Sequence, residues 1–234
     1  GIELMMERML EPAFTEEDFA RVKTQLMESL MQARKSGPSL AGRAMGAVLA
    51  GPDHPLSYPG SGLPSTVEAI TLDDVRSFYS AHIPGHLAGI LVSTSLSQEE
   101  LLPRLAAFAE IQATRLEREP VDRLPEISGR TLYLVNKDEA AQSTLRMGYP
   151  SIKYDALGDY YLAGLMNFNL GGTFDSRINL NLREDKGYTY GINSGFRGDR
   201  ELGSYRISSE VNKEATTQAI REVLAELEKY SAEG

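Results

Sequence analysis

The chain has 234 residues, of which 41% are hydrophobic and 24% charged, an ordinary composition for a folded globular protein of one or two domains. Its net charge of −9 disfavours nucleic acid as a partner, because the phosphates would be repelled. No apolar run reaches the roughly 18 residues that a membrane-spanning helix requires. The absence of cysteine excludes disulfides and thiolate metal sites. Because helix-like sequence stands at both ends, we expect a fragment of a longer chain.

The first part of the chain, residues 1–112, predicts a helical region with one strand. Apolar residues at helical spacing predict helices, which cover residues 3–10, 15–36, 39–50, 71–79 and 97–108. Thr15, Thr71 and Ser97 each stand three residues before an acidic residue, which is the spacing of a capping box at a helix start. Residues 86–95, HLAGILVSTS, are an apolar run of strand length and predict a strand.

Residues 130–234 predict a second region, which a polar linker over residues 113–129 separates from the first. Strand-like patterns cover residues 131–135, 142–148, 188–196 and 202–211, and helical spacing covers residues 155–170, 174–186 and 214–230. The last two strands are joined by a turn near residues 197–199, which indicates antiparallel pairing. The sequence therefore predicts an α+β protein with a mostly antiparallel sheet packed by helices.

One helix–glycine–strand unit brings two hydrogen-bond donors into the same region. Gly187 suits the left-handed conformation that ends a helix, so Arg183 falls in the last helical turn and Tyr190 on the strand that follows. Two interpretations fit. In the first, Arg183 meets the negative end of the helix dipole and Tyr190 is a half-buried strand aromatic. In the second, both side chains are donors directed at a substrate backbone. Spacing alone does not choose between them.

The sequence around this pair resembles the signature of the non-catalytic half of the pitrilysin/insulinase family of zinc metallopeptidases, which also contains the mitochondrial processing peptidase. Members carry N-x-x-LGG-x-F-x-SR followed by LRE-x-(K/R)-G-x-x-Y. Every fixed position is present in this chain, namely Asn167, Leu170, Gly171, Gly172, Phe174, Ser176, Arg177, Leu182, Arg183, Glu184, Lys186, Gly187 and Tyr190. The resemblance is sharp over residues 142–211 and looser before residue 130.

The resemblance implies a fold of the processing-peptidase type and a role in peptide hydrolysis. In the family, the zinc half and the arginine/tyrosine half close around a peptide, and the positions that match Arg183 and Tyr190 contact its backbone near the scissile bond. The chain would then be a non-catalytic, substrate-binding segment of a zinc metalloendopeptidase. Its partners would be a peptide and a zinc-bearing half in the same or another chain. The alternative is a scaffold or binding module of this fold with no role in proteolysis.

The order of elements suggests two incomplete domains. Compared with the family, residues 1–112 resemble the end of one domain and residues 130–234 resemble the start of the next. We expect these half-domains to complete one another, either as a circularly permuted monomer or as a swapped homodimer. The predicted strand over residues 86–95 would then lie in or beside the sheet of the second half.

The catalytic motif of the family, H-x-x-E-H on a helix, is missing. The chain has three histidines, His54, His82 and His86. His82 and His86 are four residues apart, but Pro84 and Gly85 interrupt a helix between them and no glutamate stands there, so we interpret both as loop histidines. We therefore expect no catalytic residue, metal site or cofactor in this segment, with zinc confined to the catalytic half. A bacterial periplasm and a cytoplasm both fit the composition.

Overall fold

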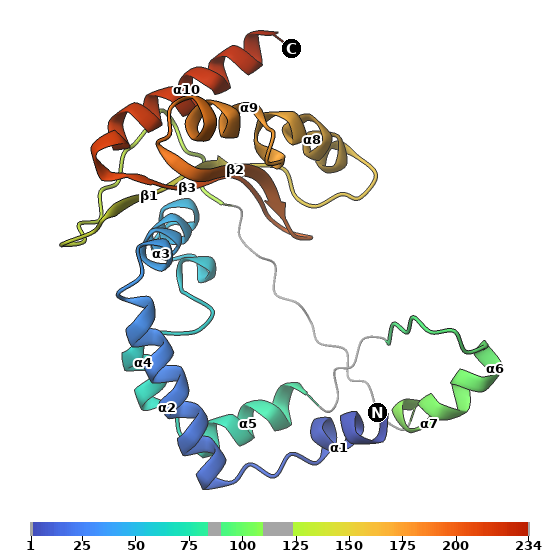
Figure 1. Cartoon of the computed structure of the whole chain (residues 1–234). Coiled ribbons are helices and arrows are strands. Elements are labelled where there is room, and N and C mark those ends of the chain that lie inside the picture. Colours follow the sequence, from blue (N-terminus) through green and yellow to red (C-terminus); the bar gives the residue numbers. More distant parts are fainter. Residues whose placement is uncertain (1, 84–89, 110–123, 234) are drawn as a thin grey trace. The chain divides into compact units, whose positions relative to one another are not determined.

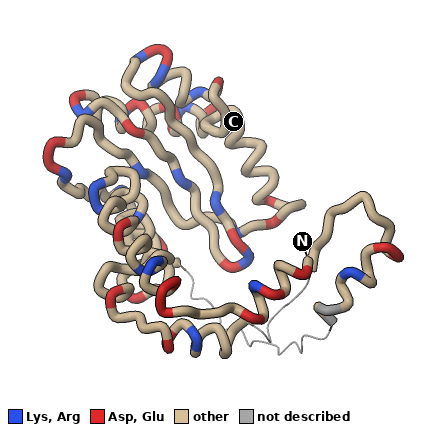
Figure 2. Tube along the Cα trace, turned by 60° about the horizontal axis from the view of Figure 1, so that its bottom comes forward, with Lys and Arg blue, Asp and Glu red and all other residues tan. Residues whose placement is uncertain are grey.

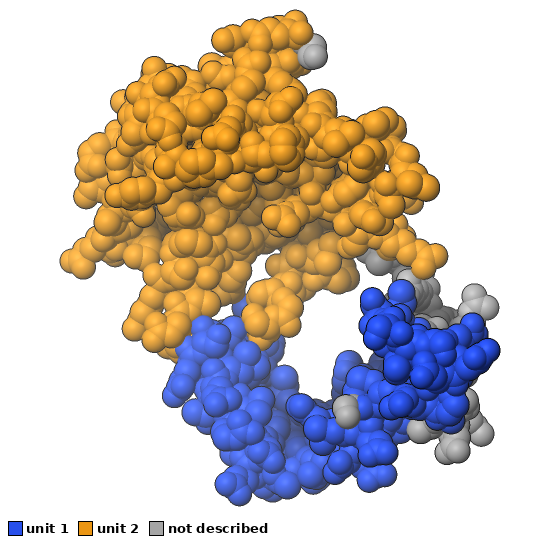
Figure 3. Space-filling view, turned by 45° about the vertical axis from the view of Figure 1, so that its right-hand side comes forward, with its two compact units in different colours: residues 1–30, 63–120 blue, residues 31–62, 121–234 orange. Residues whose placement is uncertain are grey.

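The computed structural model describes residues 2–83, 90–109 and 124–233 (Figure 1). They form two compact units, shown in different colours in Figure 3, one of Gly1–Leu30 with Leu63–Pro120 and one of Met31–Gly62 with Val121–Gly234. Across the described ranges, every helix is too short or too polar to cross a membrane. The boundaries predicted at residues 112 and 130 stay a prediction, and most of the proposed linker, residues 113–123, lies outside the described residues.

The first unit is built from helices whose starts carry the predicted caps. Its elements are α1 (Ile2–Leu10), most of α2 (Glu16–Ala33), α4 (Pro64–Ala69), α5 (Leu72–His82), α6 (Gln98–Leu101), η2 (Leu102–Leu105) and α7 (Ala106–Ala109). At the start of α5, the Asp74 N–H donates to Thr71 Oγ1 (3.1 Å) and the Asp74 carboxylate accepts from the Thr71 N–H (2.8 Å). Ser97 and Glu100 form the same reciprocal pair at α6. Both capping boxes are confirmed.

The second unit contains a three-stranded antiparallel sheet. Its strands are β1 (Gln142–Pro150), β2 (Thr189–Gly198) and β3 (Gly203–Asn212), in the order β1-β3-β2. The hairpin that joins β2 to β3 is closed at its tip, where Asp199 accepts from the N–H groups of Glu201 and Leu202, both at 2.8 Å. These three strands confirm the predictions over residues 142–148, 188–196 and 202–211, and with the helices described below they confirm the α+β class.

Helices cover the two faces of this sheet unequally, as Figure 1 shows. α8 (Asp159–Asn167), α9 (Arg177–Asn179) and α10 (Thr216–Glu233) lie on one face, together with the π-helical segments η3 (Phe168–Gly172) and η4 (Leu180–Asp185). On the other face, α3 (Gly37–Ala50), which the short η1 (Pro55–Ser57) follows, packs against β1. The final helix was predicted over residues 214–230 and is found as α10, after the 3₁₀ turn η5 (Lys213–Ala215).

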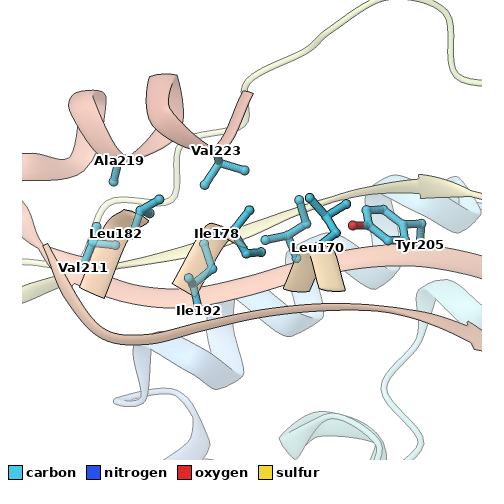
Figure 4. Close-up of a cluster of buried hydrophobic side chains, with 9 residues drawn as sticks. Leu170, Ile178, Leu182, Ile192, Tyr205, Val211, Ala219 and Val223 are labelled. Atoms are coloured by element: carbon cyan, nitrogen blue, oxygen red, sulfur yellow. The ribbon is translucent and has the colours of Figure 1, made fainter. Parts of the chain in front are cut away.

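The core lies between the sheet and the layer formed by η3, α9, η4 and α10 (Figure 4). Ile178 and Leu182 reach into it from α9 and η4, and both are fully buried. Strands and α10 supply its other buried side chains, which are Ile192, Tyr205, Ile207, Val211, Ala219 and Val223, with Leu170 from η3. Burial on this scale holds the signature segment against the sheet and so fixes where the residues of the motif emerge.

Several predictions of extended or apolar structure are wrong. Residues 131–135 form no strand, and Leu132 and Leu134 are 79% and 89% exposed. A strand was also predicted over residues 86–95. Residues 90–95 belong to no sheet, and residues 86–89 lie outside the described residues. β-propensity reflects how well side chains fit a sheet surface, but a strand also needs a neighbouring strand to satisfy its backbone hydrogen bonds. In the described part of the chain, neither segment has such a neighbour.

Two helix predictions also need correction. Gly37 and Pro38 do not end α2, which stops at Ala33; they open α3, where proline suits the first turn because its missing N–H has no helical acceptor there. The helix predicted over residues 155–170 begins only at Asp159. The apolar residues on which that prediction depended are exposed, namely Leu157, Tyr161, Leu162 and Leu165.

Candidate functional site

Arg183 lies in η4, the π-helical continuation of α9. The wide turn is closed by the N–H of Lys186, which donates to the carbonyl of Asn181 five residues earlier (3.0 Å). Gly187 then ends the segment with φ +65°, the left-handed conformation predicted for it. π-helical turns are frequent at functional sites because the extra residue changes where side chains emerge. With Leu182 fully buried, Arg183 emerges at the boundary of the core.

The Arg183 guanidinium is held by two neighbours. Its Cζ lies 4.0 Å from the centroid of the Phe174 ring, and the same group forms an ion pair with Glu184. Phe174 is 61% exposed, although it shares helical spacing with Ile178 and Leu182, which are both fully buried. The ring instead offers its face to the cation, an arrangement that favours arginine over lysine because the planar guanidinium stacks.

Tyr190 projects from a β-bulge at the start of β2. The pairing of β2 with β3 shifts between Thr189 and Ile192, so that two exposed residues, Tyr190 and Gly191, stand opposite the single residue Glu210. Thr189 stabilises the bulge, since its hydroxyl donates to the carbonyl of Glu210 (2.7 Å) and accepts from the N–H of Gly191 (3.0 Å). Tyr190 is 92% exposed. The interpretation of Tyr190 as a half-buried strand aromatic is therefore wrong.

Side chains from the helical layer close the outer edge of β2, where a further strand would otherwise pair. They form three hydrogen bonds: Asn179 Oδ1 accepts from the N–H of Ile192 (3.0 Å), Asn167 Nδ2 donates to the carbonyl of Ser194 (2.9 Å), and the Tyr160 hydroxyl donates to the carbonyl of Phe196 (3.2 Å). Because an unpaired edge invites non-native strand addition, these contacts both protect β2 and fix its position relative to α8 and α9.

A buried network around Asn167 supports this arrangement. Asn167 Oδ1 accepts from the Ser194 hydroxyl (2.7 Å) and from the Tyr205 hydroxyl (3.1 Å). Burial raises the pKa of Tyr205, which keeps the phenol protonated as a donor. The sequence pattern marks Asn167 only as a motif position. The signal that would reveal its buried role is a polar amide at the end of an apolar helix, where an unpaired amide would be costly to bury.

The histidines do not gather into a metal site in the described part of the chain. His82 is the last residue of α5 and not a loop residue; its ring stacks on Phe78, and Nδ1 lies 2.9 Å from the Phe78 carbonyl oxygen. His54 is buried and Nδ1 accepts from the N–H of Leu56 (3.0 Å). His86 lies outside the described residues. Among those described, no three His, Cys, Asp or Glu side chains are arranged to hold a metal ion.

Comparison with known proteins identifies the family. A family model described as the peptidase M16 inactive domain matches residues 69–234. The chain is 24% identical to the non-peptidase homolog YmxG of Helicobacter pylori over 194 residues, which are 82% of this chain and 44% of that protein. It is 23% identical to the uncharacterized zinc protease YmxG of Bacillus subtilis over 236 residues, covering 98% of this chain and 55% of that protein.

A solved structure has the same fold. The crystal structure of a peptidase M16 inactive domain from Pseudomonas fluorescens superposes with a TM-score of 0.83 at 22% identity, and the match covers 98% of this chain and 55% of that chain. The chain thus spans about half the length of the relatives that it matches. Family model and fold agree with the resemblance found in the signature: the chain belongs to the pitrilysin-like peptidase M16 family and is an inactive domain of that family.

Proposed function

We propose that this chain is the non-catalytic, substrate-binding segment of a zinc metalloendopeptidase, and that Arg183 and Tyr190 contact the backbone of a bound peptide. The observation that carries the proposal is the exposure of Tyr190. A tyrosine that is 92% exposed at a bulge contributes little to packing, so its hydroxyl is available to a ligand. Arg183 emerges from the segment that leads into the same strand and is oriented by Phe174 and Glu184.

The chemistry proposed for the two side chains is donation of hydrogen bonds. Zinc in the catalytic half would supply the activated water. Tyr190, through its hydroxyl, and Arg183, through its planar fork, would donate to carbonyl oxygens of the peptide. Donors positioned in advance stabilise the negative charge that develops on such an oxygen, because they need not reorganise during the reaction. The burial of Leu182 and the bulge at Thr189 position the backbone that carries the two donors.

The zinc-bearing half is proposed as the principal partner, in the same chain or in another. The arrangement of residues 1–112 and 130–234 as two half-domains that complete one another is likewise a proposal, and a swapped homodimer is one form that it takes. Apolar side chains are exposed in and just before α8, and Leu132 and Leu134 are exposed before β1. Because exposed apolar groups favour association, they support a contact with a partner that covers them.

A second candidate function is a scaffold of this fold without a role in proteolysis. It is favoured by one comparison, since the similar protein of Helicobacter pylori is named a non-peptidase homolog. The two candidates differ in what the full-length parent does: a peptidase component supports chelator-sensitive peptide cleavage, whereas a scaffold does not.

The test uses the segment and its full-length parent side by side. We expect the purified segment to contain no zinc by elemental analysis and to cleave no peptide, and the parent to cleave peptides until a chelator is added. Near-stoichiometric zinc in the segment would contradict the proposal, and a zinc-loaded parent with no cleavage of any peptide would favour the scaffold.

A further inference from the structure

The sheet has a second face, opposite to the core, on which arginines gather. In β3, Tyr205 and Ile207 are buried toward the helices, so Arg206 between them lies on the other face. Register places Arg197 of β2 and Arg146 of β1 on that face as well, paired with Ser204 and Ser208. Figure 2 shows basic positions in blue along the strands of the sheet. They stand out in a chain whose net charge is −9.

The three arginines differ in their partners. Arg146 is neutralised by Glu210, whose Oε1 accepts from both terminal nitrogens of the guanidinium, at 3.3 and 3.2 Å. The ion pairs of the described residues include neither Arg197 nor Arg206. Burial, together with the nearby charge of Arg197, lowers the pKa of Arg206. Two cations thus stand on one face of the sheet, and neither has a carboxylate of the described chain within ion-pair distance.

The geometry around Arg206 leaves room for a ligand on one side. Its Nε donates to the buried hydroxyl of Ser204 (3.0 Å), which fixes the direction of the guanidinium. Toward β1 the space is filled, because a Cβ on the paired residue Gly148 would lie 2.7 Å from Met45 Cε of α3. Toward β2 the paired residue is Gly195, where an added Cβ would meet nothing within 4 Å. The open side is the side of Arg197.

We propose that Arg197 and Arg206 form a binding site for a carboxylate group carried by a peptide ligand. A guanidinium binds a carboxylate through two parallel hydrogen bonds, and a second arginine adds charge without competing for the same nitrogen atoms. The bound anion removes the repulsion between the two cations. The peptide part of this inference rests on the proposed function. Tyr190 lies seven residues before Arg197 on the same strand, roughly 23 Å at about 3.3 Å per residue, a distance that an extended peptide of about seven residues spans.

The carboxylate has two sources in a peptide, an acidic side chain or the C-terminus, and the experiment separates them. Three ten-residue peptides of alanine and serine are titrated into the chain: one blocked at both ends with a single Glu, one identical but with Gln, and one with Gln and a free C-terminus. Binding is followed by the NMR signals of the arginine Nε–H groups. We expect at least one carboxylate peptide to bind about tenfold more tightly than the blocked Gln peptide, because a charge-assisted hydrogen bond replaces a neutral one.

Variants of the chain locate the effect. Arg197→Gln and Arg206→Gln each remove the preference for the carboxylate, and Arg206→Lys removes much of it because the planar fork is lost. The matched control is Arg200→Gln, in the hairpin loop beside Glu201, which leaves the preference unchanged. The melting temperature of Arg206→Gln should change little, since relief of the repulsion with Arg197 offsets the lost hydrogen bond to Ser204; a large fall would indicate a structural role and overturn the assignment.

The remaining outcomes separate this inference from the proposed function. Equal affinity for all three peptides, still weakened by Tyr190→Phe, overturns the carboxylate site and leaves the proposed function standing. If no peptide binds, the proposed function fails, and a titration with free glutarate tests the carboxylate site by itself. Shifts of the Arg197 and Arg206 Nε–H signals would support the site, and unchanged signals would overturn it. A preference for inorganic phosphate over glutarate would also overturn a site for carboxylate.

Discussion

The guanidinium of Arg183 lies over the ring of Phe174, with Cζ 4.0 Å from the ring centroid. This stack limits the rotamers of a side chain that otherwise stands at the edge of the core, and it keeps the planar fork in a defined orientation. Phe174 belongs to the same signature as Arg183, and this contact gives a physical reason for an exposed aromatic at that position.

The first prediction concerns this stack. Phe174→Leu should increase the mobility of the Arg183 guanidinium, measured by relaxation of its Nε–H signal, while lowering the free energy of unfolding by no more than about 1 kcal/mol, the scale of an exposed cation–π pair. Phe174→Tyr keeps an aromatic face and should leave the mobility as it is. Equal mobility in the Leu variant would show that Glu184 alone orients the guanidinium.

The second prediction concerns the buried amide of Asn167. Asn167→Ala leaves the Ser194 carbonyl and the Tyr205 hydroxyl without their partner inside the core. We expect a loss of about 3 kcal/mol in the free energy of unfolding, measured by urea denaturation. The control is Asn169→Ala, at an exposed position two residues on, which should change stability by less than about 0.5 kcal/mol. A similar loss in both variants would contradict the assignment to the network, because helix propensity favours alanine over asparagine at both positions.

The third prediction compares the two adjacent glycines of the signature, Gly171 and Gly172. A Cβ at Gly171 would overlap Ser194 Oγ and lie 2.6 Å from Ile178 Cδ1, both buried. Gly171→Ala should therefore destabilise the fold by about 3 kcal/mol through overpacking. At Gly172 the nearest atom to an added Cβ is the Asn167 carbonyl oxygen at 3.3 Å, so Gly172→Ala should cost clearly less. Thermal denaturation of the two variants checks the order, and a reversed order would contradict the packing described for η3.

The fourth prediction concerns pH. The N–H groups of Leu202 and Glu201 hold the pKa of Asp199 below its usual value in the folded chain. A carboxyl group with a depressed folded pKa stabilises the fold above its unfolded pKa of about 3.9, and this contribution is lost as the pH falls through the folded pKa. The stability difference between the chain and Asp199→Asn should therefore be present at pH 6 and shrink as the pH falls below about 4. A difference that stays constant would mean that the tip of the hairpin does not depend on the charge.

How much of this the sequence could predict depends on the range of the interaction. The capping box at Thr71 and the left-handed Gly187 follow from a few neighbouring residues, and both were predicted. The β2–β3 hairpin follows from alternation on either side of a turn. Residues 131–135 have the same alternation but no partner strand in the described chain, and a pattern in one segment does not report whether a partner exists.

The site shows the same division. The pattern around Gly187 placed Arg183 at a helix end and Tyr190 on a strand, as the structure has them. The bulge that exposes Tyr190 was not predictable, because it depends on the Thr189 hydroxyl reaching the carbonyl of Glu210 on another strand. A contact between residues 21 positions apart leaves no periodic signal in the sequence.

One substitution in the full-length, zinc-loaded parent decides whether Tyr190 acts on the substrate, as we propose, or on the fold. Tyr190→Phe removes a single hydroxyl at a 92% exposed position, so the melting temperature should stay unchanged. We predict that kcat/KM for peptide cleavage falls about a hundredfold, the usual cost of one donor to a developing oxyanion. Unchanged kcat/KM in a folded, zinc-loaded Tyr190→Phe enzyme would contradict the account.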